Sequence, residues 1–268
     1  MTRLAAAFAR RKVLVAYVCV GDPSVDESVE LARACLRAGA DIVELGVPFS
    51  DPAADGPAIA RASQRAIAVG GGLIAGLRAA RAVRESDADA GIVLFGYYNP
   101  VFVRGDERVA REVAEAGVDA LLVVDLPIDE APPLMDALRA HHVGLVPLLA
   151  PTSSPDRVAA VRAAAAQGGV PFAYYVSVTG VTGAGAIDAT EAGARAAGLR
   201  AELGMPVVVG FGIDSREKAR AAATRSDGAV VGTALVRAIE EGRTPAERKA
   251  AVERLVRELR AGVDEAGA

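Results

Sequence analysis

The chain has 268 residues, with 30 Lys and Arg against 34 Asp and Glu, a formal net charge of -4, and 52% hydrophobic residues. This composition supplies enough apolar side chains for a core and excludes general disorder. The absence of a basic excess argues against nucleic-acid binding. No stretch approaches the ~18 consecutive apolar residues of a membrane-spanning helix, so we expect no membrane association.

The start of the chain and the two cysteines indicate in which cellular compartment the protein is expected. Residues 1–13 lack the long apolar run of a signal peptide and are expected to form a short helix. Cys19 and Cys35 are too few for a disulfide framework or a structural zinc site. No clustered set of His, Cys and Asp indicates a metal. We therefore expect a cytoplasmic protein that holds no metal.

Short apolar runs alternate with helical segments along the chain. Asp26–Ala38, Asp106–Ala116 and Arg216–Thr224 have the residue spacing of helices. The runs between such segments are continuously apolar, which is typical of parallel strands buried on both faces. Eight strands are predicted, at Val13–Cys19, Asp41–Leu45, Ile92–Gly96, Ala120–Val124, Gly144–Leu149, Phe172–Ser177, Pro206–Gly210 and Ala229–Gly232.

A short phrase, Ala-Gly-x-Asp followed by a strand, occurs at 38–41 and again at 116–119. Its glycine is typical of a helix end, so the phrase marks a repeated strand–helix unit. Eight such units in about 250 residues predict an α/β fold, a (β/α)₈ TIM barrel formed by residues 1–268 as a single domain. Extra helices are expected at 2–10, near 75–85 after the second strand, and at 245–266. An open doubly wound sheet is the alternative, but no Gly-x-Gly-x-x-Gly follows the first strand.

The second strand and its loop carry the strongest candidates, because the active site of such a barrel lies at the carboxyl ends of its strands. Glu44 stands within an apolar run. If it points into the barrel, loss of water raises its pKa and suits it to general acid–base catalysis; if it points outward, it pairs with an arginine. Asp51 and Asp55 follow in the loop. By spacing, Asp55 or Gly56 is expected to cap the helix that begins near Pro57.

Glycine-rich turns end the seventh and eighth strands, at Gly210-Phe211-Gly212 and Gly232-Thr233-Ala234. Their backbone N–H groups, together with the start of a helix, form the recurrent phosphate site of these barrels. The uncharged loop at 177–186 suits a lid over a phosphate substrate, or it is simply flexible. Weaker candidates end other strands: Tyr97, Tyr98 and Asn99 with a turn closed by Pro100, Asp125 and Pro127, one of Tyr174 and Tyr175, and Cys19.

Five motifs stand in order at these strand ends: Val20–Pro23, Glu44–Pro52 with Ala54–Pro57, Tyr97–Pro100, Gly180–Gly183 and Gly210–Ile213. Together they closely resemble the signature of the tryptophan synthase α subunit family. The resemblance covers nearly the whole chain, and five motifs in order make it highly specific. Three places depart from the common family pattern, where a larger Leu, an Arg and a Thr are frequent: Ala53, Val178 with Thr179, and Cys19.

The resemblance implies a retro-aldol cleavage of indole-3-glycerol phosphate to indole and glyceraldehyde 3-phosphate. It implies no cofactor in this chain. Indole would pass to a β subunit, within an α2β2 complex, where pyridoxal phosphate chemistry joins it to serine. Two alternatives remain open at this point: a stand-alone indole-3-glycerol phosphate lyase, and a non-catalytic barrel that binds phosphate and activates a partner.

The resemblance also implies roles for single residues. The catalytic residues are Glu44, Asp55 and, by counting back from Gly180, Tyr174. The substrate contacts are Tyr17, Tyr97, Thr182 and Phe211. The phosphate-binding residues are Gly183, Gly212, Gly232 and Thr233. The rim facing the β subunit comprises Pro48, Asp51, Asn99, Asp125 and Pro127.

Overall fold

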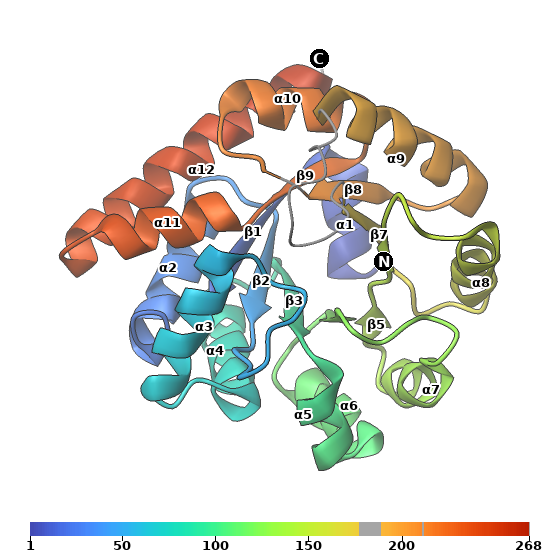
Figure 1. Cartoon of the computed structure of the whole chain (residues 1–268), viewed down its shortest axis with the longest axis horizontal. Coiled ribbons are helices and arrows are strands. Elements are labelled where there is room, and N and C mark those ends of the chain that lie inside the picture. Colours follow the sequence, from blue (N-terminus) through green and yellow to red (C-terminus); the bar gives the residue numbers. More distant parts are fainter. Residues whose placement is uncertain (177–188, 211, 268) are drawn as a thin grey trace.

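The computed structural model describes residues 1–176, 189–210 and 212–267. Within these ranges the strands are β1 (Val13–Cys19), β2 (Ile42–Gly46), β3 (Gly91–Gly96), β4 (Ala120–Val123), β5 (Gly144–Leu145), β6 (Leu148–Leu149), β7 (Ala173–Val176), β8 (Val207–Gly210) and β9 (Gly228–Val231). They form one sheet in the order β5-β4-β3-β2-β1-β9-β8-β7-β6, and neighbouring strands are parallel. Figure 1 shows this sheet curled into a barrel inside a ring of helices.

The helices cover the outside of the sheet and one end of the barrel. They are α1 (Arg3–Arg10), α2 (Val25–Arg37), α3 (Pro57–Ala68), α4 (Leu73–Ser86), α5 (Tyr98–Arg104), α6 (Asp106–Glu115), α7 (Pro132–Ala140), α8 (Pro155–Ala166), α9 (Ala189–Leu203), α10 (Arg216–Thr224), α11 (Thr233–Glu241) and α12 (Pro245–Gly267). The extra helices expected at the two termini and after the second strand are present as α1, α12 and the pair α3 and α4. No single described helix is long and apolar enough to cross a membrane; α3 and α4 reach those limits only together, across a 95° bend.

The fifth predicted strand is divided into β5 and β6 by Val146 and Pro147. Proline has no N–H to give to a ladder, so it interrupts a strand. The segment still bonds on both sides: the Val146 N–H donates to the Leu121 carbonyl at 2.8 Å, and the Tyr174 N–H donates to the Pro147 carbonyl at 3.0 Å. The sheet is thereby closed, and the eight-unit barrel predicted from the sequence is confirmed.

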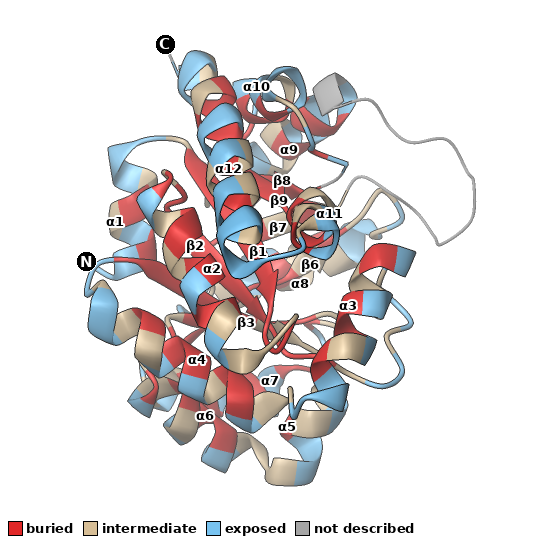
Figure 2. Ribbon diagram, turned by 90° about the vertical axis from the view of Figure 1, so that its left-hand side faces the viewer, coloured by how far each residue is buried: buried red, intermediate tan, exposed pale blue. Residues whose placement is uncertain are grey.

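Side chains alternate along each strand between the barrel interior and the layer under the helices. Val13 and Val15 of β1 and Ile42 of β2 belong to one interior cluster with Leu4 of α1, so α1 fills the amino end of the barrel. The residues between them pack outward in a second and larger cluster with the helices. Figure 2 shows the buried strands and the buried inner faces of the surrounding helices. Glu44, two residues beyond Ile42, therefore faces the interior.

The recurring Ala-Gly-x-Asp phrase has two structural roles. Gly39 and Gly117 adopt positive φ angles of 116° and 77° and end α2 and α6. The aspartate then accepts a backbone N–H from the neighbouring strand, and a third aspartate does the same before β9. The pairs are Asp41 with Leu14 (2.9 Å), Asp119 with Ile92 (2.8 Å) and Asp227 with Val207 (2.9 Å). The phrase thus joins adjacent strands at their amino ends.

Candidate active site

Glu44 lies in the middle of β2 with its side chain inside the barrel. The residue is 1% exposed, and its Oε1 has no hydrogen-bond partner among the described residues. Tyr17 of β1 and Val93 of β3 are its register neighbours. Burial raises the pKa of this carboxyl to about 8. At neutral pH the group is therefore largely protonated and able to give up a proton.

Two tyrosines from other strands project into the same interior. The ring of Tyr17 occupies the space over Gly46, and the ring of Tyr174 occupies the space over Gly210, so a side chain at either glycine would collide with the phenol. Burial, with a smaller contribution from the charge of Glu44, raises the pKa of Tyr174. Tyr175 is turned to the outer layer under the helices. The glycines thus make room for two hydroxyls near Glu44.

Asp55 stands in the loop between β2 and α3, immediately before the helix. Gly56 is the N-cap of α3 and Pro57 its first residue, and no side chain caps this described helix start. Of the two caps that the spacing allowed, the structure uses Gly56. The carboxylate of Asp55 is therefore not engaged in holding the helix.

Tyr97 holds the Asp55 loop in place. Its hydroxyl accepts the Ala54 N–H at 3.0 Å and is hydrogen-bonded to the Asp55 carboxyl. The ring of Phe49 stacks on Tyr97, with centroids 5.0 Å apart. Burial raises the pKa of Asp55 to about 6, and the Tyr97 hydroxyl partly opposes this rise. Asp55 is thus ionised at neutral pH while Glu44 is not, so the two carboxyls differ in protonation.

The segment after β3 differs from the expected turn. Tyr98, Asn99 and Pro100 begin the short helix α5 instead of ending in a turn at Pro100. Proline is tolerated there because the first turn of a helix leaves its N–H groups without intrahelical partners. The Asp125 carboxylate at the end of β4 accepts the Tyr98 N–H at 2.7 Å. Asp125 therefore stabilises the start of α5.

The glycine turn after β9 leads directly into a helix. Gly232 is the N-cap of α11, Thr233 is its first residue, and no side chain caps this helix start among the described residues. The first N–H groups of α11 therefore have no intrahelical partner, which favours an anion. Gly212, after the adjacent strand β8, is exposed and has a φ of 53°. Thr182, Gly183 and Phe211 lie outside the described residues.

The sequence and the fold both match one known family. The model of the family described as tryptophan synthase alpha chain matches residues 4–264. The chain belongs to this family. The tryptophan synthase alpha chain of Geobacter sp. strain M21 is 50% identical over 230 residues, covering 86% of this chain and 84% of that one. The one from Thioalkalivibrio sulfidiphilus is 43% identical over 270 residues, covering 98% and 100%.

Solved structures agree with this assignment. The tryptophan synthase α subunit of Legionella pneumophila superposes with a TM-score of 0.88 at 32% identity and covers 99% of both chains. A tryptophan synthase chain from Mycobacterium tuberculosis gives 0.86 at 38% identity and covers 98% of both. The tryptophan synthase alpha chain is the lyase subunit: it cleaves indole-3-glycerol phosphate to indole and passes the indole to a β subunit.

The rim residues that the family resemblance assigns to the β subunit differ in exposure. Asp51, Asn99 and Asp125 are exposed and Pro127 is half-buried. Pro48 is buried, and its ring lies beside Gly71, so it is the least exposed of the five residues that the resemblance assigns to this rim.

Two exposed apolar side chains at this rim were not predicted from the sequence. Phe102 and Val103 are 69% and 77% exposed on α5, the helix that carries Asn99. The signal available in the sequence was the run Val101-Phe102-Val103 beside polar residues. An exposed phenylalanine next to a valine is typical of a contact surface.

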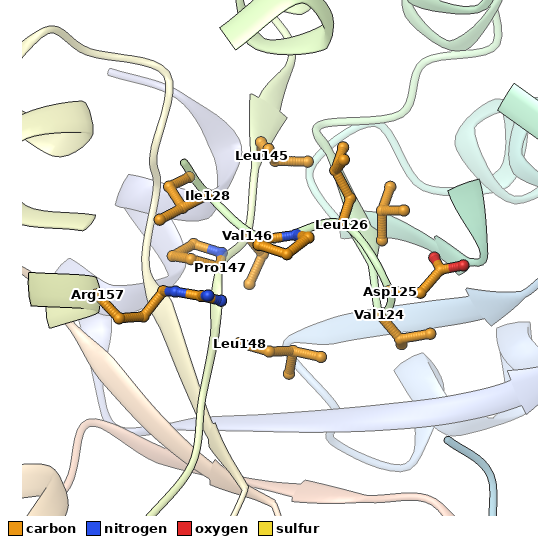
Figure 3. A pocket seen from close by; sticks show the side chains of 11 residues that line it. Val124, Asp125, Leu126, Ile128, Leu145, Val146, Pro147, Leu148 and Arg157 are labelled. Atoms are coloured by element: carbon orange, nitrogen blue, oxygen red, sulfur yellow. The ribbon is translucent and has the colours of Figure 1, made fainter. Parts of the chain in front are cut away.

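A cavity of about 140 Å³ opens at the barrel mouth between the ends of β4 and β6 (Figure 3). It lies beside Pro147, where β5 pairs only with β4 and β6 pairs only with β7 among the described strands. Its lining is mostly apolar, with Asp125 at one side and the Arg157 guanidinium at the other. Arg157 pairs with Asp129 at 3.1 Å. No group of three His, Cys, Asp or Glu residues in the described ranges could hold a metal.

Proposed function

We propose that Glu44 and Asp55 carry out the cleavage of indole-3-glycerol phosphate in this chain, with distinct roles set by their environments. Glu44, protonated through burial, delivers a proton to C3 of the indole ring. Asp55, ionised and held by Tyr97, lies near N1–H and stabilises the positive charge that develops on the ring. The observation that carries the proposal is the buried Glu44 carboxyl inside the barrel, one oxygen of which has no hydrogen-bond partner in the described part of the chain.

The reaction then balances without an external reactant. Once C3 is protonated, the ring accepts electrons. Glu44, now a carboxylate, removes the proton from the hydroxyl on the carbon attached to C3. The bond between C3 and that carbon breaks, its electron pair returns to the ring, and an aldehyde forms. The products are indole and glyceraldehyde 3-phosphate, and Glu44 is again protonated. These steps require no group beyond side chains of this chain.

The remaining residues of the site bind and orient the substrate. Tyr17 is the register neighbour of Glu44 and Tyr174 projects into the same interior, so we assign them contacts with the indole ring and the reacting carbons. The family resemblance assigns further substrate contacts to Thr182 and Phe211, and we include both in the proposal. The phosphate binds the N–H groups of Gly232 and Thr233 at the start of α11, and Gly212 after the adjacent strand takes part. The family resemblance adds Gly183 to this set.

The rim of the mouth forms the surface for the β subunit. Support comes from the exposed Asp51 and Asn99 and from the exposed apolar pair Phe102 and Val103 on α5, the helix that carries Asn99. Asp125 and Pro127 border the cavity at the same mouth. We place an α2β2 assembly here, with pyridoxal phosphate in the partner only. Free indole is small and uncharged, so a partner that covers the mouth retains it.

The single-domain organisation and the compartment complete the proposal. Residues 1–268 act as one catalytic domain, because the first and last helices both pack on the same barrel. The cysteines of the described chain, Cys19 and Cys35, are free and buried, which suits a reducing cytoplasm.

The decisive experiment is an assay of the purified chain with indole-3-glycerol phosphate, in which indole and glyceraldehyde 3-phosphate are both measured. We expect slow turnover by the chain alone and faster turnover when a β subunit is added. Absence of turnover in both conditions would favour the non-catalytic, phosphate-binding alternative. Equal rates with and without the β subunit would favour a stand-alone lyase.

The rim is tested separately with Asp51→Ala and Phe102→Ser. Both side chains are exposed and lie outside the interior that holds Glu44, so the basal rate should stay near that of the wild type. The activation by the β subunit should fall severalfold, with the larger loss for Phe102 because buried aromatic contacts dominate interfaces. If Asp51→Ala lowers the basal rate as much as the activated rate, Asp51 belongs to the catalytic site.

A further inference from the structure

An ion cluster that includes one buried carboxylate lies behind the site, at the loop that follows β1. Asp22 in this loop is 2% exposed. Both of its carboxylate oxygens accept hydrogen bonds from the guanidinium of Arg65 on α3, each at 2.8 Å. A two-point arginine–carboxylate contact fixes orientation as well as distance. The last turn of α3 is therefore anchored to the loop at the carboxyl end of β1.

The same guanidinium reaches a third segment. Arg65 Nη1 donates to Glu240 on α11 at 2.8 Å, and Arg61 on α3 donates to Glu240 through two nitrogens at 3.0 and 2.8 Å. These bonds hold the pKa of Glu240 low, at about 2, so it is ionised throughout the neutral range. Arg65 thus links the β1 loop, α3 and α11.

The apolar contact between α3 and α11 only weakly fixes the position of one helix along the other. On α3 the buried residues at every fourth position are Ala58, Ala62 and Ala66, and they cluster with Val236 of α11 and with Tyr17. Alanine side chains allow close approach but have no length with which to interlock. Ile59 of α3 packs against the same cluster beside Gly232, at the start of α11. Further along the two helices, the charged bonds from Arg65 and Arg61 hold their relative position.

Each linked helix begins at a different part of the proposed site. Asp55 directly precedes Gly56, the N-cap of α3, and the Gly232-Thr233 turn begins α11. At about 1.5 Å per residue, Arg65 and Glu240 lie about 10 Å along their helices from these starts, away from the substrate. Neither side chain touches the reacting atoms. A displacement of one helix against the other changes the distance between Asp55 and the phosphate turn.

We propose that Arg65 is a positioning residue that, through Glu240, fixes the separation between the phosphate-binding turn and Asp55. This rests on the proposed roles of Asp55 and of the Gly232-Thr233 turn. The substrate is held by its phosphate at the turn and by its indole ring at Asp55. Any change in the separation between these two places therefore shifts N1 of the ring relative to the Asp55 carboxylate. The rate of the chemical step, and not the binding of phosphate alone, is what the cluster controls.

The test uses Glu240→Ala in the full chain, with Glu112→Ala as its matched control. Glu112 likewise accepts from two arginines, Arg104 and Arg108, and its pKa is likewise lowered to about 2, but it joins α5 to α6. We measure kcat and KM for indole-3-glycerol phosphate, the Kd of inorganic phosphate, and the melting temperature. For Glu240→Ala we expect kcat to fall about tenfold while the phosphate Kd stays unchanged. Glu112→Ala should leave kcat unchanged.

Two results with Glu240→Ala would overturn the proposal. A lower melting temperature with wild-type kcat would show that the cluster only stabilises the fold. A phosphate Kd that weakens in proportion to kcat/KM would show that Glu240 acts on the turn itself and not on its placement. An equal fall in kcat for Glu112→Ala would also overturn the proposal. Loss of an ion cluster that joins other helices would then lower kcat as much, so the effect would not depend on the link between α3 and α11.

Arg65→Lys supplies an independent test. Lysine keeps the charge beside buried Asp22 but cannot contact both of its oxygens and Glu240 together. We expect a loss of kcat at least as large as in Glu240→Ala, with a native near-ultraviolet circular dichroism spectrum; wild-type kcat would contradict the proposal. Asp55→Asn in the same assay distinguishes failure of the proposed function from failure of the positioning role. If that variant keeps full activity, the proposed function fails; if it is inactive while Glu240→Ala has wild-type kcat, only the positioning role fails.

Discussion

At the amino ends of the strands, Asp41, Asp119 and Asp227 each accept a backbone N–H from a neighbouring strand and pair with an arginine. Asp41, for example, is bonded to Arg260 at 2.8 Å and to Arg11 at 2.9 Å. Towards the carboxyl ends, Glu44 is buried more deeply than these aspartates, and its Oε1 has no hydrogen-bond partner among the described residues. Burying an unpaired ionised group is costly, so its pKa rises instead. The paired carboxylates stabilise the barrel, and the unpaired one is available for chemistry.

Among substitutions at the amino or the carboxyl ends of the strands, Glu44→Gln should have the largest effect on activity. The amide keeps the shape of the side chain but cannot deliver and recover a proton. We expect kcat to fall by at least about 10²–10⁴-fold, the usual contribution of one general acid–base group, while the substrate still binds. Steady-state kinetics with a separate measurement of substrate binding checks this. A purified Glu44→Gln protein with near wild-type turnover would sink the assignment.

Asp55→Asn should also reduce kcat by orders of magnitude, because an amide cannot balance the charge that develops at N1. Folding should be unaffected, since Gly56 and not Asp55 caps α3. Asparagine can still hydrogen-bond to Tyr97, so the loop keeps its anchor. Kinetics and thermal melting of the same preparation give the answer. Joint loss of fold and activity would mean that Asp55 belongs with the structural carboxylates.

Asp41→Asn is the corresponding change at the amino end. It leaves the guanidinium of Arg260, whose side chain is 8% exposed, without its buried counter-ion. Breaking a buried pair costs about 3–5 kcal/mol, so the free energy of unfolding should fall by that amount, with kcat unchanged well below the melting temperature. Urea unfolding measures the first quantity and the indole assay the second.

A matched control lies on the same arginine. Asp264 also pairs with Arg260 at 2.8 Å, but its side chain is 52% exposed. Asp264→Asn should therefore cost less than about 1 kcal/mol. If Asp41→Asn lowers kcat in the folded protein, or if the two aspartates prove equivalent, the division between a structural and a chemical end of the barrel is wrong.

The fold was predictable because the strands are continuous apolar runs separated by helical spacing, and their bounds agree with the structure within two residues. The break at Pro147 had a signal in the sequence, since proline disrupts a ladder. The helix α5 was missed because Pro100 was interpreted as a turn residue, although proline is also compatible with a first helical turn. Both errors concern a single proline whose effect depends on its position within an element.

The site was predictable in part. The position of Glu44 within an apolar strand made it a candidate, and the family resemblance added Asp55, for which spacing alone also allowed a helix cap. The sequence left open which way Glu44 points, because a shift of one residue moves a strand side chain to the other face. The register with β1 and the interior position of Ile42 settle its direction. The ion cluster could not be found from spacing at all. Arg65 is 43 residues from Asp22 and 175 from Glu240, and only the closed barrel brings them together.

The pH dependence of kcat/KM should show the smallest effect and the sharpest contrast between the two carboxyls. The pKa of Asp55 is raised to about 6, so activity should rise with pH as Asp55 loses its proton. The pKa of Glu44 is raised to about 8, so activity should fall again as Glu44 ionises and can no longer donate. The profile is then a bell with its maximum near pH 7, declining about tenfold per pH unit on each side.

The alkaline limb is the diagnostic one. The substrate phosphate itself titrates at about pH 6, so the acid limb combines its ionisation with that of Asp55. Near pH 8 no substrate group changes charge, and the described cysteine Cys19, whose pKa is raised to about 12, stays protonated. Initial rates at low substrate concentration between pH 5 and 9.5 record both limbs. A profile that stays flat from pH 7 to 9 would show that Glu44 is ionised throughout this range and that its burial does not prepare it to donate a proton.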